Sequence, residues 1–248
     1  MTNQAGFSIG GAMVSSTRKA PPPDAEMKEL EKTRAQDEPP LQIDPDLVGW
    51  WTFDEGAGDA VDLSGKGHAG KLVGGAKYVE GKFGGGIQGN GGSDGVQVAD
   101  AEDLRISGDL TMALWVKKTA ETGDWVCVFG RGTKDARNYG LWLEAGTRMY
   151  MFQQYGGGDV NVKGKKLIDL GQWTHLAATI EQNMVRIYFN GVLDHEERRP
   201  GPPAMPLASL GIGFAMFHTA LTGVVDDARL YRRALSADEI RTLVEMGK

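Results

Sequence analysis

The sequence predicts an all-β protein: an antiparallel β-sandwich or jelly roll, preceded by an extended N-terminal tail and closed by one C-terminal helix. Three observations predict this fold class. The 248 residues include 36 glycines without a collagen-like period, which is typical of many strands joined by tight turns. Short segments of alternating apolar and polar residues follow one another, each bounded by Gly, Asp or Asn. Helical periodicity is clear only at the C-terminus, so the strand–helix alternation of an α/β fold is missing.

Residues 1–46 differ from the rest and are predicted to form an extended, proline-rich tail. They hold six of the ten prolines and no tryptophan, so this stretch cannot build its own core. Within it, residues 24–36 are compatible with a short helix capped by Asp24, although a lone helix of this length is marginal in water. Two alternatives follow: a flexible linker, or a tail that orders against this domain or a partner. Residues 47–248 are predicted to form one jelly-roll domain.

The predicted strands are short, as in a sandwich. Asn190-Gly191 lies between the predicted strands 185–189 and 192–194 and predicts a two-residue hairpin turn, because both turn positions need a positive φ. The predicted strand segments are 47–53, 71–79, 95–99, 110–117, 125–129, 139–144, 148–154, 173–180, 185–189, 210–214 and 224–231.

The C-terminal segment is predicted to be a helix that covers an edge or an end of the sandwich. Ser236 and Glu239 form a capping box. Ile240, Leu243 and Val244 then supply an apolar stripe at helical spacing.

Composition excludes several classes of protein. Lys plus Arg number 27 and Asp plus Glu 33, and this net charge of −6 argues against a nucleic-acid binder. The single Cys127 allows no internal disulfide and lies in an apolar run, which predicts a buried core residue rather than a nucleophile. No apolar run approaches the roughly 20 residues of a transmembrane helix. The first residues lack a basic region followed by an apolar stretch, so no ordinary signal peptide is expected in the chain as given.

Four parts of the sequence resemble motifs of the bacterial laminin-G-like family, the concanavalin A-like lectin/glucanase jelly rolls. They are 47–58 with the turn 62–70, then 81–89, then 110–116 with 171–179, and finally 223–236. The last segment, GVVDDARLYRRALS, is the most specific. The resemblance extends over about residues 47–246 and implies a concanavalin A-like jelly roll. It also implies an extracytoplasmic location: periplasmic, cell-surface or secreted.

Two acidic residues are candidate metal ligands. Asp54 ends the first strand and Asp226 lies in the last, and these strands are often neighbours in a jelly roll. Carboxylates with turn carbonyls suit Ca²⁺, which takes 6–8 oxygens. The resemblance to laminarinase-type enzymes implies a structural calcium at Asp226, completed by Asp54 and the carbonyl of Gly89. The alternative is that Asp226 and Asp227 pair with nearby arginines or turn amides.

Catalytic motifs are poorly represented, and a binding surface is the better prediction. The Glu-x-Asp-x-x-Glu strand of laminarinase-type enzymes does not occur, and the four histidines lack metal-ligand spacing. Sugars are held by aromatic faces and a few polar groups. The candidates for such a surface are Trp125, Trp142, Gln153, Tyr155 and Asp159.

Each of these candidates has a competing interpretation. The two tryptophans are expected in the core, whereas Tyr155 lies beside a glycine run and is the better candidate for exposure. Arg131, Arg137 and Arg148 could bind an acidic group, with a solvated face as the favoured alternative.

The leading functional hypothesis is a non-catalytic binding or adhesion module for a glycan or a protein. One alternative is a structural accessory subunit whose tail docks into a larger assembly. A weaker one is a glycan-cleaving enzyme.

Overall fold

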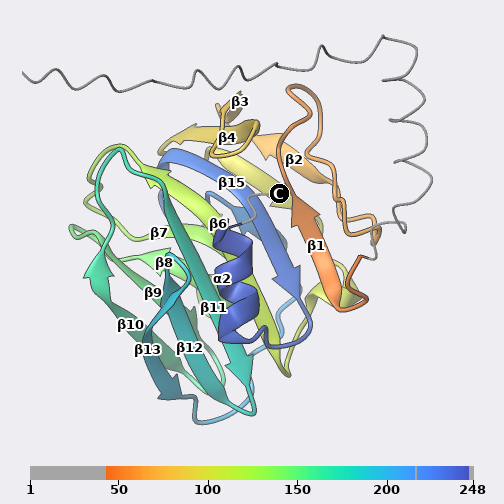
Figure 1. Ribbon diagram of the computed structural model, residues 1–248, viewed down its shortest axis with the longest axis vertical. Helices are drawn as coiled ribbons and strands as arrows, with labels where there is room; N and C mark the ends of the chain where they lie inside the picture. The colour runs from red at the N-terminus through yellow and green to blue at the C-terminus, as the bar shows by residue number, and fades with distance from the viewer. Residues whose placement is uncertain (1–42, 216, 246–248) are drawn as a thin grey trace, which may run out of the picture. The chain divides into compact units, whose positions relative to one another are not determined.

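The computed structural model describes residues 43–215 and 217–245, which fold into two antiparallel β-sheets packed face to face (Figure 1). This confirms the predicted jelly-roll sandwich. The predicted helix within residues 24–36 and the rest of the tail up to residue 42 lie outside the described residues. Of the predicted tail only residues 43–46 are described, and Asp44 accepts a 3.0 Å hydrogen bond from Nε of Arg233.

The two sheets draw their strands from all parts of the described chain. The eight-stranded sheet runs in the order β13 (Val192–Arg198), β12 (Met184–Phe189), β11 (Thr174–Glu181), β6 (Leu110–Lys118), β15 (Thr222–Tyr231), β4 (Gly85–Asn90) and β3 (Lys77–Glu80), with β1 (Leu47–Trp51) paired to β15. The seven-stranded sheet runs in the order β10 (Val160–Leu167), β9 (Met149–Gln154), β8 (Arg137–Leu143), β7 (Val126–Gly132), β14 (Leu210–Ile212), β5 (Gly95–Val98) and β2 (Gly70–Val73). The first and last strands are therefore neighbours, as the sequence predicted.

The main hydrophobic core lies between the sheets. In β6, Leu110, Met112, Leu114 and Val116 alternate into this core, as the period of two in a strand requires. Trp51 of β1 and Phe129 of β7 meet edge to face with centroids 6.2 Å apart, which joins the two sheets. Burying such aromatic side chains is a large part of what holds a sandwich together.

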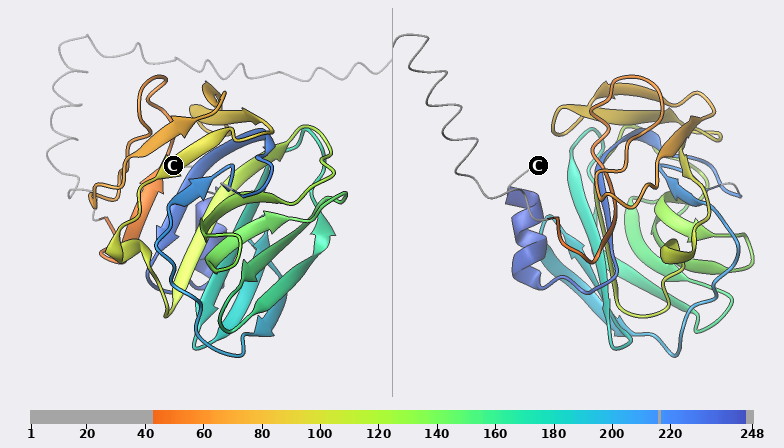
Figure 2. Two further views of the ribbon diagram at one scale, coloured as in Figure 1. Left: turned by 180° about the vertical axis from the view of Figure 1, so that it is seen from behind. Right: turned by 90° about the vertical axis from the view of Figure 1, so that its right-hand side faces the viewer.

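The outer face of the eight-stranded sheet is covered. Helix α2 (Ala237–Glu245) packs Ile240 into a second apolar cluster with Ala113, Ala177 and Tyr188 of the sheet (Figures 1 and 2). The capping box is confirmed: the N–H of Glu239 donates to Oγ of Ser236 at 3.2 Å, and the N–H of Ser236 donates to the Glu239 carboxylate at 2.8 Å.

Beside the helix, the β3–β4 turn covers the same face. Phe83 meets Trp115 edge to face, with centroids 5.8 Å apart, and Nζ of Lys82 lies 4.7 Å from the Trp115 ring. No α-helix in 43–215 and 217–245 lies over the seven-stranded sheet, whose outer face carries a smaller cluster of Cys127, Trp142 and Met151. That outer face is therefore the more open side of the domain.

The strand predictions were wrong in two respects: one segment was wrongly joined, and two strands were missed. The segment 71–79 is two strands in different sheets, β2 and β3, because the chain turns at Gly74 with φ of 63°. The strands β4 and β10 were not predicted, since β4 reads GGIQGN and β10 reads VNVKGKKL, both poor in the β-branched and aromatic residues that mark strands. The Asn190-Gly191 hairpin is confirmed, with φ of 49° and 79°.

Candidate functional site

Asp54 and Asp226 both bind the backbone of the β3–β4 turn. Oδ1 of Asp54 accepts the N–H of Gly85 at 2.7 Å. Oδ2 of Asp226, a buried side chain, accepts the N–H groups of Lys82 and Phe83 at 2.8 Å each. The adjacency of the first and last strands therefore brings these two carboxylates to one turn.

Gly89 does not join them, and this corrects the predicted ligand set. It lies four residues beyond Gly85 along β4, which at about 3.3 Å per residue is roughly 13 Å away. A Cβ on Gly89 would stand 2.7 Å from the carbonyl oxygen of Leu221. Glycine at this position therefore allows the backbones of residues 89 and 221 to lie close together.

The interactions around Asp226 and Asp227 match the alternative that the sequence offered. Asp226 holds turn amides, and Asp227 pairs with Arg229 at 3.0 Å. Within the described part of the chain, no group of three Asp, Glu, His or Cys side chains is placed to hold a metal ion. Carbonyl oxygens of the turn would have to supply most of the six to eight ligands that Ca²⁺ requires. Calcium binding at Asp54 and Asp226 stays a prediction.

The outer face of the seven-stranded sheet carries a hollow of about 390 Å³, which we call the aromatic hollow. It unites three of the five predicted ligand-binding residues. Its lining consists of Trp125, Lys134, Asp135, Arg137, Gln153, Tyr155 and His218. Its volume lies within the range of about 300–1,000 Å³ that is typical of ligand sites.

The neighbouring strands β8 and β9 set the geometry of this hollow. The backbones of Arg137 and Tyr155 exchange hydrogen bonds of 2.8 and 3.0 Å, which places the two residues side by side at the end of the pair. Gln153 precedes Tyr155 by two residues and therefore lies on the same face. The Tyr155 side chain is 46 % exposed, as its position beside the glycine run suggested.

The other two predicted ligand-binding residues are placed differently. Trp142 is only 2 % exposed and belongs to the cluster with Cys127 and Met151, so the core alternative was correct, and it does not line the hollow. Asp159 does not line the hollow, because its carboxylate accepts the N–H of Gly157 at 3.0 Å and shapes its own loop. An Asp that caps a turn in this way is a common local motif.

Arg137 is the central residue of the hollow, although the sequence favoured a solvated face for it. Its guanidinium carbon lies 4.4 Å from the ring centre of Trp142, 5.4 Å from that of Phe217 and 5.7 Å from that of Tyr155. It donates to Oε1 of Gln153 and lies 3.3 Å from Nε2 of His218. Burial lowers the pKa of Arg137, yet an arginine stays protonated in proteins.

His218 reaches the hollow from a distant loop. Burial and the charge of Arg137 lower the pKa of His218, whereas Asp124 raises it by a smaller amount. A neutral imidazole accepts the Arg137 N–H at Nε2, which leaves the proton on Nδ1, 3.7 Å from Asp124. The backbone N–H of Trp125 lowers the pKa of Asp124, which is the opposite of what a general acid needs.

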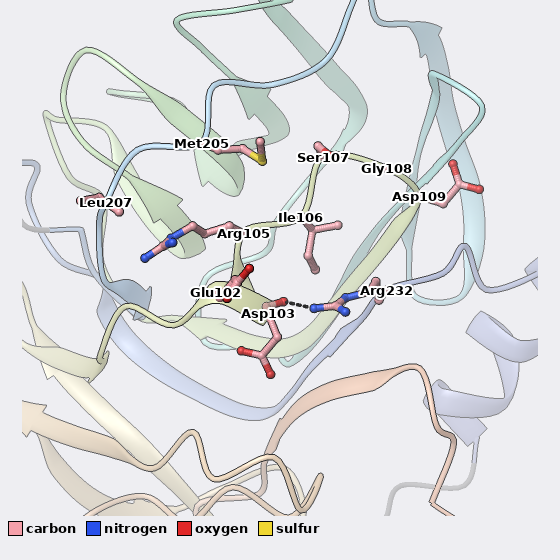
Figure 3. A pocket seen from close by; sticks show the side chains of 10 residues that line it. All are labelled: Glu102, Asp103, Arg105, Ile106, Ser107, Gly108, Asp109, Met205, Leu207 and Arg232. Carbon is pink, nitrogen blue, oxygen red and sulfur yellow. Dashed lines mark hydrogen bonds between the residues drawn. The ribbon is translucent and has the colours of Figure 1, made fainter.

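A larger hollow of about 920 Å³ lies elsewhere, among the loops that carry Glu102–Asp109, Met205 and Leu207 (Figure 3). It contains no aromatic ring. Its two arginines are already engaged: Arg105 pairs with Asp100, and Arg232 donates to the carbonyl of Asp103 at 2.8 Å. This loop hollow therefore offers less of what sugar binding needs than the aromatic hollow.

The aromatic hollow shares Lys134 with a neighbouring hollow of about 530 Å³. The second hollow is mostly apolar and includes Phe217, one of the rings around Arg137, together with Gln97 and Ser209.

Comparison with known proteins identifies the family. A sequence model of the concanavalin A-like lectin/glucanases superfamily, Laminin_G_3, matches residues 90–241, and the chain belongs to this superfamily. No significant match is found among curated protein sequences. Within the described residues, no helix is long and apolar enough to cross a membrane.

Several solved structures have a similar fold. Domain 4 of AbnA, a GH43 extracellular arabinanase from Geobacillus stearothermophilus solved with arabinotriose, is 27 % identical with a TM-score of 0.62, and the match covers 80 % of this chain and 98 % of that one. The binding domain of Paraclostridial Mosquitocidal Protein 1 is 16 % identical with a TM-score of 0.66, covering 83 % of this chain and 53 % of that one. The binding domain of botulinum neurotoxin DC, solved with rat synaptotagmin II, is 11 % identical with a TM-score of 0.64, covering 84 % and 53 %.

The lengths of these matches differ. The chain spans about half of each toxin domain but almost all of the arabinanase domain. At their low identities, the toxin domains share the fold alone.

Proposed function

We propose that this protein is a non-catalytic carbohydrate-binding module, and that it holds an oligosaccharide in the aromatic hollow. The observation that carries the proposal is the convergence of Trp125, Tyr155, Gln153 and Arg137 on one open face. Aromatic rings supply apolar faces for sugar rings, and the amide and guanidinium supply hydrogen bonds to hydroxyl groups. The neighbouring hollow that shares Lys134 gives room for further sugar residues.

The similarity to the arabinanase domain supports the proposal. That domain was solved with arabinotriose and matches this chain over nearly its whole length. A module that binds polysaccharide works where polysaccharides occur, so we also propose an extracytoplasmic location. The alternative role as a subunit docked by its tail depends on residues 1–42, which are outside the described residues.

Isothermal titration calorimetry with a panel of oligosaccharides tests the proposal. The panel should include arabinotriose, neutral gluco-oligosaccharides and oligogalacturonates. We expect at least one oligosaccharide to bind. Trp125→Ala and Tyr155→Ala should each weaken binding about fivefold or more, which corresponds to a loss of about 1 kcal/mol of binding free energy. Trp173→Ala is the matched control, since Trp173 is a half-buried tryptophan stacked under Lys117 at 4.9 Å and does not line the hollow.

Two results would contradict the proposal. One is the absence of binding to any glycan of the panel by the full chain. The other is binding that survives both hollow variants but is lost in Trp173→Ala, which would place the site elsewhere. Release of new reducing ends from a bound glycan would overturn the non-catalytic part of the proposal.

A further inference from the structure

Arg137 differs from most arginines of the domain in what surrounds it. Most of them pair with a carboxylate, among them Arg131 with Asp100 and Arg229 with Asp227. Arg199 has no such pair, but its buried guanidinium donates to four oxygens, of Asn183, Gln154, Ser107 and Gly108. The Arg137 guanidinium forms no ion pair with any carboxylate in 43–215 and 217–245, and its acceptors there are one oxygen and one ring nitrogen.

This leaves hydrogen-bonding capacity in the hollow. A guanidinium has five N–H donors, of which the bonds to Gln153 and His218 use two. Taking a cation partly out of water without an anion is costly, and here burial already lowers the pKa of Arg137. Stacking on Trp142 offsets part of this cost and holds the plane of the guanidinium in one orientation.

The charges around the hollow determine which ligand this arrangement favours. Lys134 adds a second positive charge at the rim, and Asp135 a negative one. Asp124 is occupied by the N–H of Trp125 at 2.8 Å and the hydroxyl of Thr219 at 3.1 Å, and it faces His218. Lys134 and Asp135 form no ion pair within the described residues either, but Arg137 is the charged group that stacking and hydrogen bonds hold in place, and it presents a planar, cationic fork to the hollow.

We propose that the aromatic hollow is selective for an acidic sugar, and that Arg137 binds the carboxylate of a uronic-acid residue. This inference rests on the proposed glycan-binding function and specifies its ligand class. Tyr155 and Trp125 contact the sugar ring, while the free N–H groups of Arg137 donate to the two carboxylate oxygens. Gln153 and His218 are positioning residues that hold the fork by accepting its other N–H groups.

The test compares two ligands that differ only in whether their carboxyl groups are charged or methyl-esterified. Tetragalacturonate and its methyl ester have the same sugar rings, but only the first carries carboxylates. We expect the unmodified full-length protein to bind the acid about tenfold or more tightly than the ester, because a hydrogen bond to a charged group is stronger than one to a neutral group. Raising NaCl from about 0.1 M to about 1 M should weaken binding of the acid and leave the ester unchanged.

Variants then assign the preference to Arg137. Arg137→Gln removes the charge and should bring the two affinities together, whereas Arg137→Lys should keep only part of the preference because it loses the fork. Arg198→Gln is the matched control: Arg198 also forms no carboxylate pair in the part of the chain described, donates to the Gln182 carbonyl at 3.2 Å, and lies in the other sheet. Should Arg137→Gln not fold, the acid-to-ester ratio of the unmodified protein still decides the question.

The outcomes separate this inference from the proposed function. Equal affinity for acid and ester, with both lost in Tyr155→Ala, would overturn the acidic specificity and keep the glycan-binding function. Tighter binding of a sulfated oligosaccharide or of an acidic peptide than of tetragalacturonate would also overturn it. No binding of either galacturonate, together with binding of arabinotriose in the hollow, would do the same. No binding of any glycan would remove both proposals.

Discussion

Replacement of His175 should change how stability depends on pH. His175 lies in β11 with its side chain 2 % exposed, and its ring meets Trp115 edge to face at 5.3 Å. Its Nδ1 is buried without a hydrogen-bond partner in the described structure. Burial, together with the charge of Arg229, lowers the pKa of His175 to about 3. The native state therefore holds this imidazole neutral over most of the acidic range.

The size of the effect follows from proton linkage. In the unfolded chain a histidine binds a proton below about pH 6.5, so between there and pH 3 the unfolded state carries one proton more. The contribution of His175 to the free energy of unfolding is therefore largest above about pH 6.5 and decreases as the pH falls. The free energy of unfolding should drop by about 1.4 kcal/mol per pH unit from this residue, or about 3 kcal/mol between pH 6.5 and pH 4.5.

Urea denaturation at pH steps from 4.5 to 7.5 measures this slope in the full chain and in His175→Leu. We expect the two proteins to differ by less than about 1.5 kcal/mol at pH 7, since the swap roughly conserves volume and breaks no Nδ1 hydrogen bond. Between pH 7 and pH 4.5 the stability difference should shift by about 3 kcal/mol in favour of the variant. Val192→Thr, at an exposed position of edge strand β13, changes no titratable group and should keep the wild-type slope. Parallel curves for wild type and His175→Leu would refute the reasoning.

Two further predictions concern the calcium candidates and the N-terminal boundary. If Asp54 and Asp226 share an ion, the melting temperature of the full chain should rise in millimolar Ca²⁺ and fall with chelator. Asp226→Ala should abolish that response, and a wild-type melting curve unmoved by either addition would end the calcium proposal. Deleting residues 1–42 should leave the melting temperature unchanged. Deleting 1–46 should lower it by a few degrees, because the hydrogen bonds from Arg233 to Asp44 and from the Arg232 N–H to the Asp46 carbonyl are lost; equal melting temperatures for the two truncations would contradict this.

The fold was predictable because its motifs are local. The strands around Trp115 and Trp173 show clear alternation, and the capping box at Ser236 and Glu239 marks the helix directly. The unpredicted strand β4 was hidden by a different requirement. Gly85 packs against the backbone of Phe53, and a Cβ at position 85 would stand 1.9 Å from the Phe53 carbonyl oxygen. Only glycine allows so close an approach, although glycine has a low propensity for strands.

The candidate site was predictable only in part, because it depends on contacts between distant segments. Tyr155 was found from its position next to a glycine run, and Gln153 was predicted as a polar group of the same binding surface. His218, however, is 81 residues from Arg137 along the chain, and no local pattern relates them. Arg137 looks like any surface arginine in the sequence, since only the fold shows that it lacks an acidic partner among the described residues. An unpaired charge is a property of the folded arrangement, and single-sequence reasoning has no access to it.

The two faces of the sandwich use the same pairing of a cation with a tryptophan in opposite ways. On the eight-stranded sheet, Lys82 lies over Trp115, and the backbone N–H groups of Lys82 and Phe83 are held by the buried carboxylate of Asp226. The turn is thereby fixed as a cover, and the tryptophan beneath it is structural. On the seven-stranded sheet, Arg137 lies over Trp142, but only Gln153 and His218 hold its guanidinium, and the space above it is the aromatic hollow. On the eight-stranded sheet a carboxylate holds the covering turn in place, whereas none of the described carboxylates pairs with Arg137 on the seven-stranded sheet. An acidic ligand would therefore give Arg137 the counter-charge that it lacks there.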